Sequence, residues 1–358
     1  MNTRFATAMR RALEQARAQD PRTATEIIRE ALAGTSRPAR SGPIGLSSLS
    51  RPLAGMPTLE QGLPGMRREA AAGGLDALKR APDRRVPHVP DGARYDARHV
   101  AGPHGGRDCK LFVPSDRPDG AVGLVLMLHG CTQDADDFAC GTDMNIAAED
   151  HGFVVVYPEQ SRSHNMQACW NWFRPEDQRR EQGEAAILAN IAVQIARENG
   201  VPRDRVFVAG LSAGGAMAAT LAATHPDVFV AAGVHSGLPA GCANDVASAF
   251  AAMRGNRADK NQTARIPLIV FHGTADTTVA PVNATRLVPE GGIETAHCGN
   301  GRNWTRLTTE TGSELWRVHG GGHAWFGGNP AGSYTDPTGP DATVEMLRFF
   351  REIKATGR

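Results

Sequence analysis

Long hydrophobic runs are the first feature that this sequence lacks. The longest, such as VGLVLML at 122–128, fall far short of the roughly 20 apolar residues that a membrane-spanning helix needs. We therefore predict no transmembrane segment. The chain also has almost no net charge, because 39 Lys and Arg residues are balanced by 38 Asp and Glu residues. Without a basic surplus, nothing in the composition indicates a nucleic-acid partner.

Metal-binding and phosphate-binding patterns are missing as well. The cysteines are scattered and form no CxxC pair of the kind found at zinc sites, and no glycine-rich phosphate loop is present. We therefore predict no metal and no cofactor. An even number of cysteines permits disulfides without requiring them, so bridges and free thiols both fit. The six cysteines are Cys109, Cys131, Cys140, Cys169, Cys242 and Cys298.

The N-terminal region has no uninterrupted apolar core, because charges break up MNTRFATAMRRALEQARAQD. A signal peptide needs such a core of about 7 to 15 residues, so we predict no export signal and take the cytoplasm as the default compartment. Residues 4–19 and 23–33 have the pattern of two short helices, and residues 34–94 are rich in Gly, Pro, Ser and Arg, as linkers are. We predict a basic extension over 1–94, either a solvated tail or a segment that docks on an anionic surface, a polyester granule or a partner.

From residue 95 to 358 the sequence predicts one α/β catalytic domain. Apolar runs are followed by glycine-bearing turns and helical stretches, which is typical of a mostly parallel sheet with helices on both faces. Functional groups of such sheets gather at the carboxyl ends of the strands. The predicted strands are 109–114, 121–130, 152–158, 205–210, 228–237, 266–273 and 314–320, and the main predicted helices are 183–199, 213–224 and 341–354.

The pentapeptide GLSAG at 210–214 lies between a predicted strand and a predicted helix. In this G-x-S-x-G context the serine stands on a tight turn, and side chains at the two flanking positions would collide with the neighbouring strand or helix. We therefore predict that Ser212 is a nucleophile. A serine needs an imidazole to take its proton and a carboxylate to orient that imidazole.

Candidates for both partners follow Ser212 in the order Ser, Asp, His that this motif has. Asp276 comes after the strand 266–273, and His323 follows three glycines. The rival acids lie in or near helical stretches, and the rival histidines are predicted to lie on or at the end of strands as structural or packing groups. These rivals are Asp227, Asp245, Asp259, His235, His272 and His319.

Two backbone N–H groups should bind the negative oxygen of the reaction intermediate. One is that of Ala213, directly after the nucleophile, and the other is that of Cys131, after the strand 121–130. A Cys131 thiol nucleophile is an alternative, but the sequence places no separate base for it.

Six segments of the chain resemble, in the same order, the esterase family that includes poly(3-hydroxybutyrate) depolymerases and feruloyl or acetylxylan esterases. They are LHGCTQDADDF, GFVVVYPEQ, CWNWF, GLSAGGAMA, FHGTAD and GGGHAW. The resemblance covers residues 95–353 and implies an α/β-hydrolase fold. It also implies a serine carboxylesterase with Ser212, Asp276 and His323 as its triad. Much of that family is secreted, whereas this N-terminus predicts no export signal.

Three tryptophans are candidates for contact with the acyl group, namely Trp170, Trp172 and Trp325, and Trp325 is expected at the rim of the site because it follows His323 by two residues. For two of the three CWNWF aromatics, Trp170, Trp172 and Phe173, a hydrophobic plug under a loop is the alternative. A bridge between Cys131 and Cys169 would join the oxyanion loop to the CWNWF loop, and Cys242 with Cys298 is a second pairing to consider.

The predicted substrate is an ester, and three interpretations stay open. The lack of an export signal and of a carbohydrate-binding module favours short hydroxyacyl esters or a polyester. A feruloyl or acetylxylan esterase is the first alternative. The second is an α/β-hydrolase relative that binds a ligand without catalysis, which would be expected to have lost a triad residue.

Overall fold

The computed structural model describes residues 85–115, 120–256, 264–288 and 291–353. These residues belong to one compact unit that begins at Arg85. The predicted helices at 4–19 and 23–33, most of the predicted linker and Asp259 lie outside the described residues. The domain boundary at residue 94 therefore stays a prediction, although the sheet itself does begin at Arg94.

Within the described residues, ten strands form one sheet in the order β1-β2-β4-β3-β5-β6-β7-β10-β9-β8. The six strands from β4 to β10 in this order pair in parallel. The pairs that involve β1, β2, β8 or β9 are antiparallel. The strands are β1 (Arg94–Gly102), β2 (Gly105–Val113), β3 (Gly123–Leu128), β4 (Phe153–Pro158), β5 (Val206–Leu211), β6 (Ala231–His235), β7 (Leu268–Gly273), β8 (Ile293–Gly299), β9 (Arg302–Thr308) and β10 (Glu314–Val318); β11 (Trp325–Phe326) and β12 (Thr335–Asp336) form a separate parallel pair.

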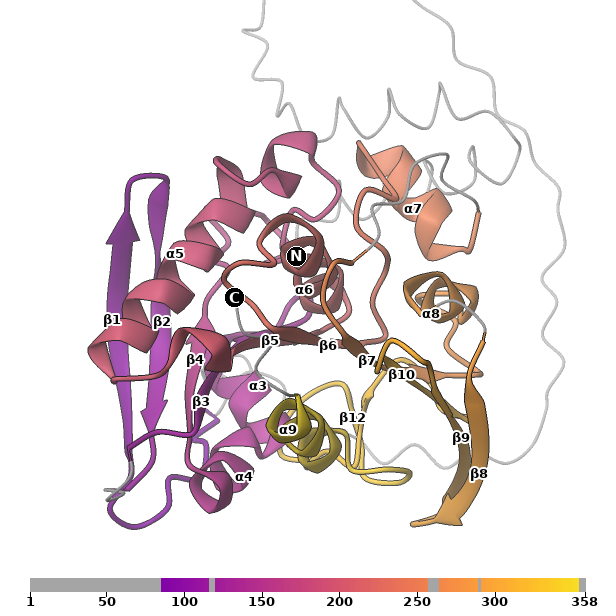
Figure 1. The fold of residues 1–358 in the computed structure, drawn as a ribbon. Helices are drawn as coiled ribbons and strands as arrows, with labels where there is room; N and C mark the ends of the chain where they lie inside the picture. Colours follow the sequence, from indigo (N-terminus) through magenta and orange to yellow (C-terminus); the bar gives the residue numbers. More distant parts are fainter. Residues whose placement is uncertain (1–84, 116–119, 257–263, 289–290, 354–358) are drawn as a thin grey trace, which may run out of the picture. The chain divides into compact units, whose positions relative to one another are not determined.

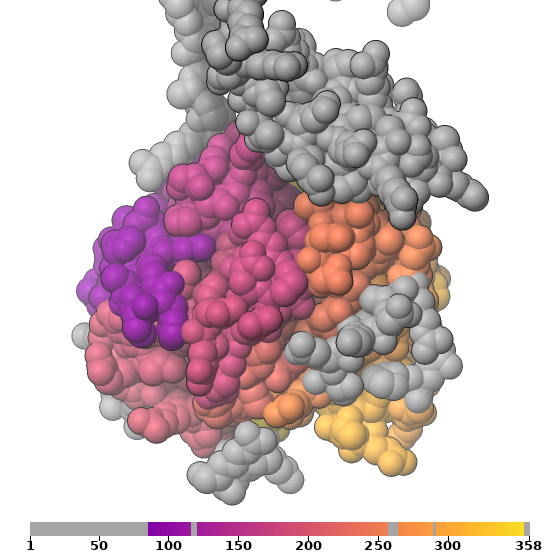
Figure 2. Space-filling model, turned by 90° about the horizontal axis from the view of Figure 1, so that it is seen from above, coloured from indigo at the N-terminus to yellow at the C-terminus, as the bar shows by residue number. Residues whose placement is uncertain are grey.

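Helices cover both faces of the sheet (Figure 1). One buried cluster lies under α5 to α8 and a second under α3, α4 and α9, so the core has two layers. Seen from above, the purple segment that contains β1 and β2 and the orange segment that contains α7 and α8 lie on opposite sides of this unit (Figure 2). The helices are α3 (Ala135–Thr142), α4 (Met144–His151), α5 (Gly183–Glu198), α6 (Ala213–Thr224), α7 (Val246–Met253), α8 (Val282–Leu287) and α9 (Ala342–Glu352), with short 3₁₀ turns at Pro175–Gln178 and Arg203–Arg205.

The predicted α/β class is confirmed, and so is each of the seven predicted strands within a few residues at either end. The sequence analysis missed β1, β8 and β9, the antiparallel strands near the two edges. Their residues are largely exposed or half-buried, so they lack the continuous apolar runs that mark strands buried on both faces. No helix within the described ranges is long and apolar enough to cross a membrane.

Candidate active site

Ser212 lies between β5 and α6 in a backbone conformation that non-glycine residues rarely adopt, with φ 56° and ψ −114°. Such strain persists only where surrounding contacts hold it. The Ser212 N–H donates to the carbonyl oxygen of His235 at the end of β6 (2.9 Å), and its own carbonyl accepts from Ala216 N–H in α6 (2.9 Å). The turn therefore presents Ser212 at the carboxyl edge of the parallel strands.

The two glycines of the pentapeptide are required by close backbone contacts. A Cβ atom on Gly214 would lie 2.0 Å from the carbonyl oxygen of Leu128, and one on Gly210 would lie 2.5 Å from the carbonyl carbon of Gly214. Both distances are far below van der Waals contact. The collision that the sequence analysis expected at these two positions is thus confirmed.

Asp276 and His323 come together as expected. The Asp276 carboxylate is buried, and its Oδ2 lies 2.7 Å from Nδ1 of His323, whose side chain keeps 12 % of its surface exposed. The Oδ1 atom accepts from the backbone N–H groups of Thr278 and Val279 (2.8 and 2.9 Å). The carboxylate is therefore held on both oxygens, and it fixes Nδ1 of the His323 imidazole.

The pKa of Asp276 reflects these contacts. Burial raises it, but the hydrogen bonds from His272 and His323 outweigh burial and hold the pKa of Asp276 well below its ordinary value. A carboxylate stabilised in its charged form in this way stays ionised while an imidazole titrates.

Backbone hydrogen bonds join the loop that carries Asp276 to the loop that carries His323. Thr274 N–H donates to Val318 O and Ala275 N–H to Gly321 O, both at 2.9 Å. A Cβ on Gly273 would lie 2.2 Å from Gly321 O, so only glycine permits this approach. The run of glycines before His323 therefore serves to bring the two loops together.

The rival acids and histidines of the sequence analysis have other positions and other contacts. His319 is exposed in the turn after β10, so the expectation that it lies on the strand is wrong; the strand ends at Val318. Among the acids, Asp227 pairs with Arg180 at the surface (2.6 Å), and Asp245 caps the N-terminus of α7. His235 and His272 are both buried, as packing or hydrogen-bonding groups would be.

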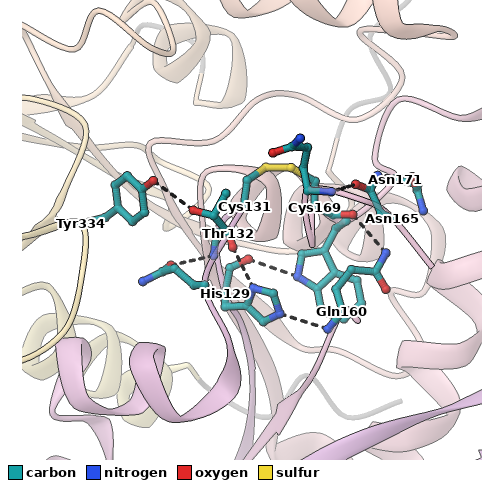
Figure 3. Close-up of a disulfide and its surroundings, with 12 residues drawn as sticks. His129, Cys131, Thr132, Gln160, Asn165, Cys169, Asn171 and Tyr334 are labelled. Atoms are coloured by element: carbon teal, nitrogen blue, oxygen red, sulfur yellow. Dashed lines mark hydrogen bonds between the residues drawn. A yellow bond between two sulfur atoms is a disulfide. The ribbon is translucent and has the colours of Figure 1, made fainter. Parts of the chain in front are cut away.

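Cys131 follows β3 and is joined to Cys169 by a disulfide (Figure 3). The bridge connects the loop after β3 to the CWNWF segment, as the sequence analysis considered, and it leaves no free thiol for a Cys131 nucleophile. The other pairing considered is wrong, because Cys242 is a buried free cysteine and Cys298 an exposed one.

The loop after β3 passes close to Ser212. A Cβ on Gly130 would lie 3.7 Å from Cβ of Ser212, and the Gly130 N–H donates to Oε1 of Gln133 (2.9 Å). Gln133 in turn donates to the carbonyl oxygen of Ser333 (3.1 Å). Hydrogen bonds therefore hold the loop in which Cys131 follows Gly130. The other predicted oxyanion residue, Ala213, is the first residue of α6.

A buried network of hydrogen bonds and one ion pair is centred on Glu184, next to the Cys169 end of the disulfide. Glu184 accepts from the backbone and side chain of Asn171 (both 2.7 Å), from Arg107 (3.3 Å) and from Gln160. Gln160 also donates to the carbonyl oxygen of Cys169 (3.0 Å). These contacts fix the segment on the Cys169 end of the bridge, and the sequence analysis missed them because a single Glu on a helix gives no pattern.

The tryptophans predicted to contact substrate are core residues. Trp170 is fully buried and donates to the carbonyl oxygen of His129 (3.1 Å), and Trp172 is 7 % exposed. Trp325 is 1 % exposed, stacks on His235 and donates to Thr343 (3.0 Å). The expected position of Trp325 at the rim does not agree with this burial; its ring fills the layer beneath the sheet.

Tyr334 is a half-exposed aromatic that the sequence analysis did not select. Its hydroxyl lies 3.1 Å from Oγ1 of Thr132, next to Cys131 (Figure 3). Both residues have positive φ, 53° and 68°, a conformation that clusters at functional sites. A lone tyrosine in a Gly- and Ser-rich stretch offers no sequence signal for this contact.

Poly(3-hydroxyalkanoate) depolymerase C of Paucimonas lemoignei is 36 % identical over 193 residues, covering 50 % of this chain and 46 % of that protein. Feruloyl esterase B of Thermothelomyces thermophilus is 29 % identical over 240 residues, covering 59 % of this chain and 81 % of that protein. This chain thus spans about half the length of the first of these relatives.

Solved structures agree on the fold. An acetyl xylan esterase from Aspergillus awamori superposes with a TM-score of 0.57 at 21 % identity, covering 71 % of this chain and 99 % of that one. An S-formylglutathione hydrolase from Agrobacterium tumefaciens gives 0.51 at 16 %, covering 74 % and 97 %. Residues 109–291, half of the sequence, match the family described as esterase PHB depolymerase. The chain therefore has the α/β-hydrolase fold and belongs to the PHB depolymerase esterase family.

Proposed function

We propose that this protein is a serine carboxylic ester hydrolase in which Ser212, His323 and Asp276 form the catalytic triad. The observation that carries the proposal is the 2.7 Å contact between His323 Nδ1 and the buried Asp276 carboxylate, together with the strained turn at Ser212. In the proposed reaction, His323 Nε2 takes the proton of Ser212 as its oxygen attacks the ester carbonyl.

The intermediate then carries a negative oxygen, which the N–H groups of Cys131 and Ala213 bind in this proposal. His323 passes its proton to the leaving alcohol, and an acyl-enzyme remains on Ser212. Water, deprotonated by the same imidazole, releases the acid and restores the serine. Asp276 stays ionised throughout, which fits its lowered pKa.

For the substrate, we propose short hydroxyacyl esters or a polyester of them. The similarity to a poly(3-hydroxyalkanoate) depolymerase favours this choice, and the similarity to acetylxylan and feruloyl esterases keeps their substrates as the second candidate. Residues 1–94 are proposed to be a non-catalytic extension that docks the enzyme on its polymer. A side-by-side assay on 3-hydroxybutyrate oligomers, amorphous polymer, methyl ferulate and acetylated xylan separates the candidates, and preference for either of the last two contradicts the hydroxyacyl assignment.

The decisive test of the mechanism is Ser212→Ala. Loss of one hydroxyl leaves the fold intact, whereas hydrolysis of a short p-nitrophenyl ester should fall on the order of 10⁴-fold or more. Covalent labelling by a fluorophosphonate should disappear with it. Full ester turnover in the alanine variant would contradict the serine mechanism, and retained binding without turnover in the wild type would favour the non-catalytic alternative.

A further inference from the structure

His272, near the end of β7, has a buried imidazole that the proposed mechanism does not use; it is 1 % exposed. Its Nε2 lies 2.9 Å from the carbonyl oxygen of Val279 and 3.4 Å from Oδ2 of Asp276. A carbonyl and an ionised carboxylate can only accept. Nε2 therefore carries the proton of the ring, with Val279 as its main acceptor and Asp276 as the second.

The other ring nitrogen has no such role. Nδ1 of His272 is buried without a hydrogen-bond partner in the described part of the chain. A buried polar atom without a partner is unfavourable, so a residue that only fills space here would be better apolar. An apolar residue of similar size would leave Val279 O without this donor, so the Nε2–H is the feature of His272 that its surroundings use.

We propose that His272 is a positioning residue, which holds the Asp276 carboxylate in the orientation that His323 requires. This inference rests on the proposed triad. By bonding to Val279 O, His272 joins the far end of the Asp276 loop to the strand from which that loop departs. By contacting Oδ2, it gives this oxygen a second donor, opposite the two backbone donors on Oδ1.

The effect on His323 follows from how a carboxylate shares its charge. A donor on Oδ2 stabilises the carboxylate and weakens its hold on other protons. Removing that donor leaves more of the carboxylate charge to act on His323, so the acid limb of the activity profile would move to higher pH. The other charged or titratable groups around His272 are His235 on β6, which interacts electrostatically with it, and Arg317 at the paired position of β10.

The test is a matched pair of variants in the full-length protein, His272→Gln and His272→Met. The two side chains have similar length and shape, but only glutamine offers an N–H near the position of Nε2–H. Fluorophosphonate titration counts the active sites of each variant. The kcat, KM and pH profile for a short p-nitrophenyl ester are then measured per titrated site.

We expect His272→Gln to keep kcat within about threefold, with an unchanged acid limb of the pH profile. His272→Met should lose roughly 10-fold in kcat with little change in KM, and its acid limb should move to higher pH. If the methionine variant matches the wild type per active site in both readouts, or glutamine loses as much as methionine, the proposal is wrong. A failure of the triad itself gives a different result, because Ser212→Ala would then remain active.

Should the methionine variant not fold, the wild-type protein gives a second test. In a ¹⁵N-histidine spectrum, the resonance that disappears in His272→Gln belongs to His272. We expect its proton on Nε2, protected from exchange, and a bare Nδ1. A proton on Nδ1 instead would remove the proposed donor and overturn the inference.

Discussion

Two groups of loops flank the Ser212 turn on opposite sides of β5 in the order of the sheet. The Cys131 side comprises residues 129–137 and 160–184, and the His323 side comprises residues 273–279 and 319–326. The Cys131 side is held by a disulfide and by the buried pair of Arg107 with Glu184. The His323 side is held by backbone hydrogen bonds and by buried imidazoles.

The two kinds of support respond to different conditions. A covalent bridge is broken by reductant, whereas hydrogen bonds that need a neutral imidazole are broken by acid. His235, for example, accepts from the backbone N–H of Phe326 with its Nε2 (3.1 Å), which a protonated ring cannot do. Within the described residues only the Cys131 side has a bridge that reductant breaks, whereas both sides contain such an imidazole, because His129 on the Cys131 side accepts from the backbone N–H of Gln160 with its Nε2 (3.1 Å).

The largest effect is expected on the His323 side. His323→Ala removes the proposed base, so kcat should fall on the order of 10⁴-fold, whereas His319→Ala, at an exposed turn, should stay within about twofold of wild type. Because the pKa of Asp276 is lowered, wild-type activity should rise with pH in one step, that of the imidazole, rather than two. Ester hydrolysis across pH 4 to 9 measures both points. Greater damage from His319→Ala would show that the wrong histidine has been assigned.

A smaller effect is expected when the bridge on the Cys131 side is removed. Cys131→Ser with Cys169→Ser opens a loop of sequence separation 38, and the chain-entropy relation gives a loss of about 4 kcal/mol in the free energy of unfolding. We also expect kcat to fall roughly 10-fold, because the proposed oxyanion donor loses its support. Urea unfolding and turnover per titrated site measure the two effects.

Reductant provides the control for this experiment. It should lower the stability of the wild type and leave the double variant unchanged, since the other described cysteines are free. The acid limb of the pH profile should not move, because no group of the His323 side is altered. Equal urea midpoints for the oxidised and reduced wild type would mean that the bridge does not support this side.

The two sides also differ in how far the sequence predicts them. Asp276 and His323 follow strands that are buried on both faces, so apolar runs and glycines locate them. The support of the Cys131 side depends on isolated residues, such as Glu184 and Gln133, whose partners are distant in sequence. Trp325 shows the same limit, because proximity to His323 in sequence gives no information on which face of the chain turns inward.

The smallest effect concerns the pH dependence of stability, to which Asp177 and the buried histidines should contribute with opposite sign. Burial, and then the charge of Glu184, raise the pKa of Asp177 on the Cys131 side to about 6. Its folded form binds a proton more tightly than its unfolded form, so its contribution to stability is lost as pH rises from about 4 to 6. On the His323 side, burial and neighbouring histidines lower the pKa of His235. Its contribution is present above the pKa of a free histidine, about 6.5, and is lost as pH falls.

Asp177→Asn isolates the first of these effects, because asparagine can still accept from the Glu184 N–H as Asp177 does (2.9 Å) but carries no proton to lose. The variant should gain about 1–2 kcal/mol over the wild type at pH 7 relative to pH 4, measured by urea unfolding at both pH values. The decline of stability below pH 6 that His235 causes should remain in both proteins. A constant difference between variant and wild type across this range would show that Asp177 is ionised at the same pH in the folded and unfolded chain.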